Sequence, residues 1–96
     1  MAQDSTEILA RLTEQHRFPG PFLFKAIGPN QAEFVAAILG TACAVLGPNP
    51  APEVSTRDSA AGRHTAVTLT AQVERPEQVL EIWALMAKVD GVKMVM

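Results

Sequence analysis

Three residues near the middle of the chain have the types that form a serine-hydrolase triad. Asp58, Ser59 and His64 stand within STRDSAAGRHTA, residues 55–66. Nucleophilic catalysis needs a base within hydrogen-bond reach of the nucleophile, a group that orients the base, and an oxyanion hole. Here the acid and the serine are adjacent in sequence, and no Gly-x-Ser-x-Gly elbow surrounds the serine. Ser59 and Gly62 are instead typical of a tight turn. We therefore predict a hairpin and a protein that is not an enzyme.

The remaining residues that could hold a metal are few and scattered. The chain has two histidines, His16 and His64, and one cysteine, Cys43. Metal sites need several such ligands at short, defined spacings, which this sequence does not offer. A single cysteine also forms no internal disulfide. We expect no metal and no cofactor.

Charge and hydropathy restrict the classes of partner. The formal net charge is −2, which gives no overall attraction to nucleic acid or to anionic lipid. The opening MAQDSTEILARL is polar and acidic, unlike a signal peptide, and no apolar run reaches the roughly 18 residues of a membrane span. We expect a cytoplasmic protein that binds neither nucleic acid nor membrane.

The apolar pattern predicts helices and strands in a defined order. Asp4 and Glu7 resemble a capping box for a short first helix, and Asn30 and Glu33 resemble another for a second helix that ends at Gly47. A third helix is predicted from the proline at position 76 to the Asp-Gly pair at 90–91. The predicted strands span residues 22–27, 53–58, 63–73 and 92–96.

This order predicts an α+β fold of the ferredoxin-like β-α-β-β-α-β type, preceded by an extra short helix. Residues 1–17 would form an N-terminal helical extension, and residues 18–96 the domain. Right-handed crossovers give a four-stranded antiparallel sheet in the order 4-1-3-2, with two helices on one face.

Alternation along the strands predicts what the other face of the sheet presents. If the apolar residues of 63–73 point toward the helices, then Lys25, Arg57, His64 and Lys93 point away from them. Such a face is either simply solvated, or a surface for an anionic ligand, an acidic protein partner or a second subunit. The outward positions of the central strands carry no aromatic residue, which disfavours RNA binding by base stacking.

Three segments at the observed spacing resemble the YbeD-like family of small bacterial proteins of unassigned function. These segments are FPGPFLFKAIG, SAAGRHTAVTLT and VDGVKMVM, at residues 18–28, 59–70 and 89–96. The resemblance covers residues 17–96. It implies a fold like that of the ACT domain, a regulatory module that binds amino acids at dimer interfaces. It also implies a connection with lipoate attachment, through gene neighbourhood in that family.

The resemblance and the residues lead to two functional hypotheses. The first is a non-catalytic regulatory module that binds a small carboxylate at Gly28, Pro29 and Asn30. This segment corresponds to the ligand-contacting loop of ACT domains, although it is also explained as a simple strand-to-helix turn. Such a module would form a homodimer through its open sheet face or an edge strand. The alternative is an adaptor without a small ligand that binds an acidic protein through the charged face.

Overall fold

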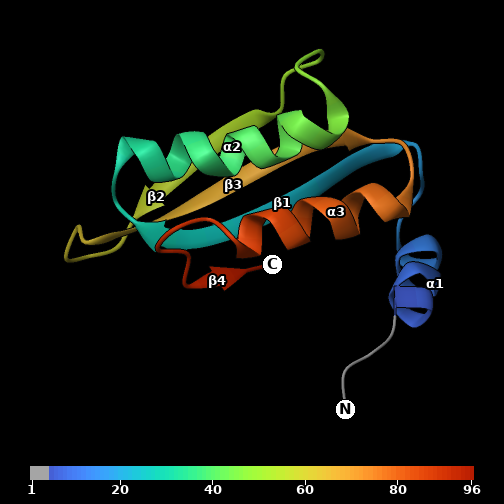
Figure 1. Cartoon of the computed structure of the whole chain (residues 1–96), viewed down its shortest axis with the longest axis horizontal. Helices are drawn as coiled ribbons and strands as arrows, with labels where there is room; N and C mark the ends of the chain where they lie inside the picture. Colours follow the sequence, from blue (N-terminus) through green and yellow to red (C-terminus); the bar gives the residue numbers. More distant parts are fainter. Residues whose placement is uncertain (1–4) are drawn as a thin grey trace.

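The computed structural model describes residues 5–96 and confirms the predicted α+β fold. The four strands form one antiparallel sheet in the order β2-β3-β1-β4, which is the predicted order 4-1-3-2 (Figure 1). Asp4 lies outside the described residues. The elements in chain order are α1 (Ser5–Gln15), β1 (Gly20–Pro29), α2 (Ala32–Leu46), β2 (Glu53–Asp58), β3 (His64–Val73), α3 (Pro76–Ala87) and β4 (Met94–Val95).

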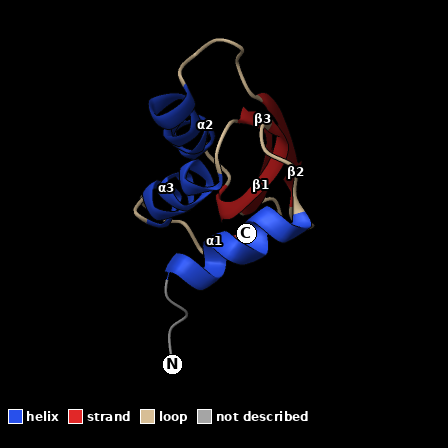
Figure 2. Cartoon of the chain, turned by 90° about the vertical axis from the view of Figure 1, so that its right-hand side faces the viewer, coloured by secondary structure: helices blue, strands red, loops and turns tan. Residues whose placement is uncertain are grey.

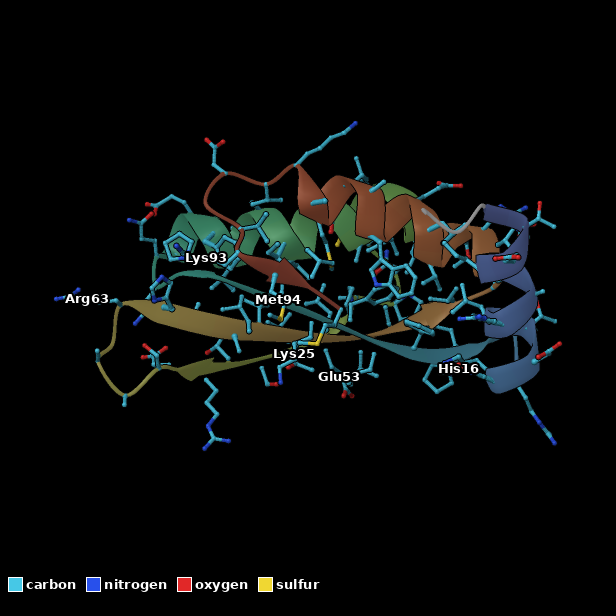
Figure 3. All side chains as sticks on the ribbon, turned by 90° about the horizontal axis from the view of Figure 1, so that it is seen from below. His16, Lys25, Glu53, Arg63, Lys93 and Met94 are labelled. Carbon is cyan, nitrogen blue, oxygen red and sulfur yellow. The ribbon has the colours of Figure 1, made fainter. Side chains whose placement is uncertain are left out.

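The molecule has two layers. Helices α2 and α3 pack side by side on one face of the sheet, as Figure 2 shows, and α1 stands across one end of both layers (Figure 3). No helix of the described chain lies over the opposite face of the sheet, which we call the outer face. That face is therefore where the strands present their side chains to solvent.

The core lies between the helices and the inward side of the two central strands. On β3 buried residues alternate with half-buried or exposed ones, and on the inward side of β1 Phe24 is fully buried. This period of two is what a half-buried strand requires. The predicted inward residues are all buried, as are the helical residues that face them: Phe22, Ala26, Val67, Leu69, Ala71, Val73, Phe34, Ile38, Ala42, Val79, Ile82 and Met86.

Helix α1 packs on the domain through its apolar side. Leu12 belongs to the core, and Ile8 packs against it. At the end of the helix the ring of His16 lies 4.8 Å from that of Phe22, whose ring in turn meets Trp83 edge-on at 6.1 Å. The helix thus closes the end of the core at which β1 begins.

The start of α2 differs from the prediction. The N-cap residue is Gln31, which makes no side-chain capping bond, so the predicted capping box of Asn30 and Glu33 is wrong. The Asn30 side chain instead donates from Nδ2 to the carbonyl oxygen of Gly62 at 3.0 Å, and its backbone N–H donates to the carbonyl of Arg63 at 3.0 Å. Asn30 is held by the β2–β3 hairpin and is therefore not available as a cap.

The last strand is shorter than predicted. It comprises Met94 and Val95 rather than residues 92–96, and it pairs with Ile27 and Ala26 of β1. Met96 continues this pairing through its backbone, because its N–H donates to the carbonyl of Lys25 at 2.7 Å and its own carbonyl accepts from the Lys25 N–H at 3.0 Å.

Gly28 lies where the end of β1 passes beneath α2. A Cβ atom at this position would lie 2.3 Å from Cζ of Phe34, whose ring is itself buried. Real Cβ contacts are longer, so either the ring or the strand would have to move. Glycine is required here by the closeness of the ring, not by backbone conformation.

We predict that Gly28→Ala destabilises the protein by about 1–3 kcal/mol, because the added methyl group overpacks the site beneath Phe34. Gly40→Ala is the matched control. Gly40 lies within α2 with nothing within 4 Å of a Cβ atom, so alanine should stabilise the helix by about 0.5–1 kcal/mol. Urea unfolding followed by Trp83 fluorescence measures both. Equal midpoints for the two variants would contradict the packing described for Phe34.

Candidate functional site

The triad-like residues form a hairpin turn, as predicted. The backbone N–H of Ser59 donates to the carbonyl of His64 at 2.9 Å, and the His64 N–H donates to Oγ of Ser59 at 3.3 Å. Gly62 closes the turn by donating to the Ser59 carbonyl at 2.9 Å, with a φ of +75° that favours glycine. The side-chain oxygen of Ser59 thus stabilises the turn, because it accepts a hydrogen bond from the backbone of His64.

The predicted carboxylate site, residues 28–30, is divided among three different roles. Gly28 is buried beneath Phe34, and Asn30 bonds to the hairpin. Of the three, Pro29 lines a groove of about 660 Å³ between the start of α2 and the end of α3, whereas Asn30 is exposed outside it. The groove is lined by Pro29, Gln31, Glu33, Phe34, Ala37, Lys88, Val89 and Asp90.

The charges around this groove do not favour an anion. Among the described residues that line it, Lys88 is the one cation, whereas Glu33 and Asp90 are both acidic. A carboxylate ligand would gain attraction from the ammonium group and lose it again to two like charges. The groove is large enough for a small metabolite, but it carries charges of both signs and gives no net attraction to a carboxylate.

Three of the four residues predicted to point away from the helices lie on the outer face. Lys25 is opposite Thr68, Arg57 is opposite Ala66, and His64 is opposite Pro29; none of these pairs is on the buried side of β3. Residues directly opposite one another in a sheet share a face, so the predicted outward direction is confirmed for these three.

Lys93 does not take its predicted place in the fourth strand. It precedes β4, and the outward position opposite Ile27 is occupied by Met94. Figure 3 shows Lys93 nearer to the helices, apart from Lys25 and Glu53. The physical reason is the pairing with β1, which sets the alternation in β4 one residue away from the predicted one.

Lys25, Arg57 and His64 do not form one cluster. Arg57 and His64 both border a shallow hollow of about 190 Å³ at the hairpin end of the outer face. Lys25 lies outside it, farther along β1. The hollow is lined by Ile27, Arg57, Asp58, Ser59, His64, Thr65 and Ala66.

The structure also shows an apolar surface that the sequence reasoning did not assemble. Leu23 is 60% exposed, and Met94 and Met96 are 51% and 50% exposed. With the half-buried Ile27 they flank Lys25, from β1 on one side and from β4 and the residue after it on the other, and we call these four residues the outer patch. Leu23 and Ile27 share the outward side of β1 with Lys25, whereas the two methionines join them only through the pairing of the chain end with β1.

Residues 5–96 show neither a cluster of metal ligands nor a helix that could span a membrane. No group of three or more His, Cys, Asp or Glu residues in this part of the chain is arranged to hold a metal ion. Among the described helices, none is long and apolar enough to cross a bilayer.

Comparison with known proteins places the chain among sequences of the same size. Residues 13–96 match the family described as "Protein of unknown function (DUF493)". A UPF0250 protein of Pasteurella multocida is 30% identical over 89 residues, which cover 91% of this chain and 97% of the relative. UPF0250 proteins of Neisseria gonorrhoeae and of Neisseria meningitidis serogroup B are each 32% identical over 79 residues, 82% of this chain and 87% of theirs. The predicted YbeD-like relationship is therefore confirmed, and the chain belongs to the DUF493 (UPF0250) family of proteins of unknown function.

Proposed function

We propose that the protein is a non-catalytic interaction module that binds a partner protein through the outer face of its sheet. The observation that carries this proposal is the outer patch. Three of its four apolar side chains are exposed, on the broad face over which no described helix lies. An exposed, contiguous apolar area is more typical of an interaction site than single apolar residues scattered over a surface.

The patch combines features of a binding surface. Leu23 and the two methionines offer apolar area, and methionine side chains adapt to the shape of what they contact. They are presented by paired strands, so the backbone beneath them is fixed by the ladder between β1, β3 and β4. A partner would thus meet a preformed surface and would not have to order it.

The charge of the outer face indicates the chemistry of that partner. The whole chain has a formal net charge of −2. On the outer face, however, Lys25 and Glu53 project from the strands, and Arg57 borders the hairpin hollow together with Asp58, so Lys25 is the charge that lies beside the outer patch. The four residues of the outer patch flank Lys25, so an acidic group of the partner that pairs with Lys25 would be partly shielded from water. We therefore expect the partner to present an apolar area that contains a carboxylate.

The first test uses a photo-crosslinking amino acid placed at Leu23 in cells that express the protein, with a second probe at Glu81 of α3 as a control. The crosslinked protein is identified and purified, and its affinity for the unmodified chain is then measured by titration. We expect crosslinking from position 23 and none from position 81, because Glu81 lies on the exposed side of a helix in the opposite layer.

Charge reversal decides whether the contact is the one proposed. Lys25→Glu should weaken the affinity for that purified partner by about tenfold or more, because an attraction is replaced by a repulsion at the centre of the contact. Lys88→Glu, the same change at the end of α3, should leave the affinity unaltered. Equal affinities for both variants and the unmodified protein would refute binding through the outer patch.

A second candidate function is regulation by a small carboxylate, and the groove beside Pro29 is the observation that favours it. The groove has room for a metabolite, and Lys88 would pair with the carboxylate. The acidic Glu33 and Asp90 at the same groove make this candidate the weaker of the two.

Thermal unfolding tests this second candidate. Amino acids, lipoate and octanoate are added in turn, and a ligand at 100 times its dissociation constant should contribute about 2.7 kcal/mol of stability. In a domain of this size the midpoint should rise by roughly 10–20 °C. Lys88→Gln should remove the rise if the groove is the site, whereas Lys25→Gln should retain it. An unchanged midpoint across the panel would exclude these carboxylates.

A further inference from the structure

Strand β2 forms an open edge of the sheet. Within residues 5–96 it pairs only with β3, and all six of its residues, Glu53–Asp58, are exposed. Val54 is 40% exposed although its opposite residue, Leu69, is fully buried, so the inward side of β2 is poorly covered by the helices. An edge of this kind offers backbone donors and acceptors to another strand.

The hydrogen bonding of the hairpin indicates which groups are free to pair. Ser59 donates to His64, which makes this a hydrogen-bonded pair of the antiparallel ladder. Such pairs alternate with non-bonded ones. Residues 53, 55 and 57 therefore bond to β3, and residues 54, 56 and 58 direct their N–H and C=O groups to the open edge.

The sequence of β2 is complementary to itself when reversed about Ser55. In an antiparallel pair of two such strands, Glu53 stands opposite the partner's Arg57, and Arg57 stands opposite the partner's Glu53. Val54 then meets the partner's Thr56, the pair that would exchange backbone hydrogen bonds. Opposite charges and β-branched residues across a strand pair are both stabilising.

We propose that two copies of this chain associate through β2 in this register, and that the partner is a second copy of the chain. The two-fold axis passes beside Ser55, whose backbone groups bond to β3 and not to the open edge. The two Ser55 residues would therefore form a non-bonded pair between two bonded Val54–Thr56 pairs. The backbone hydrogen bonds and the charges thus favour the same register. The result is a continuous eight-stranded antiparallel sheet. Because residues directly opposite share a face, the helices of both copies lie on the same side of it.

Neighbouring registers lack this complementarity. An axis between Ser55 and Thr56 would place Glu53 opposite the partner's Asp58 and would turn the outer face of one copy toward the helix side of the other. An axis at Thr56 would leave Arg57 opposite serine, without any opposite-charge pair. The charges that commonly protect an edge strand from pairing at random thus select one arrangement here.

This inference is independent of the proposed function. The β2 edge and the outer patch are separated by β3, because the patch lies on β1 and β4. In the eight-stranded sheet the two outer patches remain uncovered on the same side. Loss of one interaction therefore leaves the other measurable, and failure of one proposal leaves the other standing.

Charge reversals at β2 test the proposal, with sedimentation measurements of the full chain over a dilution series. Glu53→Arg places two Arg–Arg pairs across the seam, and Arg57→Glu places two Glu–Glu pairs there. For each variant alone, the dissociation constant of the dimer should be about tenfold or more above that of the unmodified protein. Both changes lie on exposed side chains, so circular dichroism should show an unaltered fold.

Two combinations restore the complementarity. An equimolar mixture of Glu53→Arg and Arg57→Glu chains places arginine opposite glutamate at both positions and should form a heterodimer. The double variant E53R/R57E should again form a homodimer. Recovery in these two cases is expected only if residues 53 and 57 of different copies are opposite each other.

Thr56→Pro supplies a test of the backbone contact. It removes an N–H that points to the open edge and not to β3, so the hairpin should persist while the dimer is lost. A monomeric unmodified protein throughout the dilution series would overturn the proposal. So would a dimer that survives Glu53→Arg, or single variants that fail to associate when they are mixed.

Discussion

The pairing of β1 with β3 is the central constraint on this molecule. Ten residue pairs join the two strands without interruption, from Gly20 opposite Val73 to Pro29 opposite His64. Because side chains alternate with a period of two, this register decides for both strands which residues enter the core. Phe24 and Leu69 meet on the inward side, and Lys25 and Thr68 meet on the outer face. A shift by one residue would bury the lysine and expose the phenylalanine.

The same register brings the hairpin turn beside the start of α2. Asn30 follows β1 directly, and it bonds to both Gly62 and Arg63, which precede β3 at the same end of the ladder. Gly28, two residues earlier, allows the ring of Phe34 to pack against the strand. The turn, the end of β1 and the first turn of α2 therefore form one connected unit. This explains why residues 28–30 have structural partners of their own.

The two surfaces available for association differ in physical character. The outer patch offers side chains on a fixed backbone, so recognition there depends on apolar area and on the charge of Lys25. The β2 edge offers backbone groups, so recognition there depends on register, with Glu53 and Arg57 selecting it. Neither surface needs rearrangement of the core, because both lie outside the packed layer between helices and sheet. The groove beside Pro29 has room for a small ligand, but the charged residues that line it are of both signs.

Local patterns were enough to predict most elements of the fold. The alternation in β3, the proline that begins α3 and the glycine that ends α2 act within a few residues, and the structure confirms all three. The crossover rules then gave the strand order, because a β-α-β-β-α-β chain has few sterically acceptable arrangements. Asp58 and Ser59 lie in no catalytic sequence motif, and Ser59 and Gly62 are typical turn residues. The turn could therefore be predicted from these residues alone, without knowing what packs against it.

Contacts between distant residues determined the remaining features. The orientation of Met94 follows from its pairing with Ile27, since a strand of two residues is too short for alternation to reveal which side faces inward. Asn30 resembles a helix cap in sequence, yet its side chain bonds to a residue 32 positions away. The outer patch likewise brings together residues that are about 70 positions apart in the sequence, from β1 and from the chain end at β4. Local sequence specifies the conformation of each segment, whereas the composition of a surface depends on which segments the folded sheet places side by side.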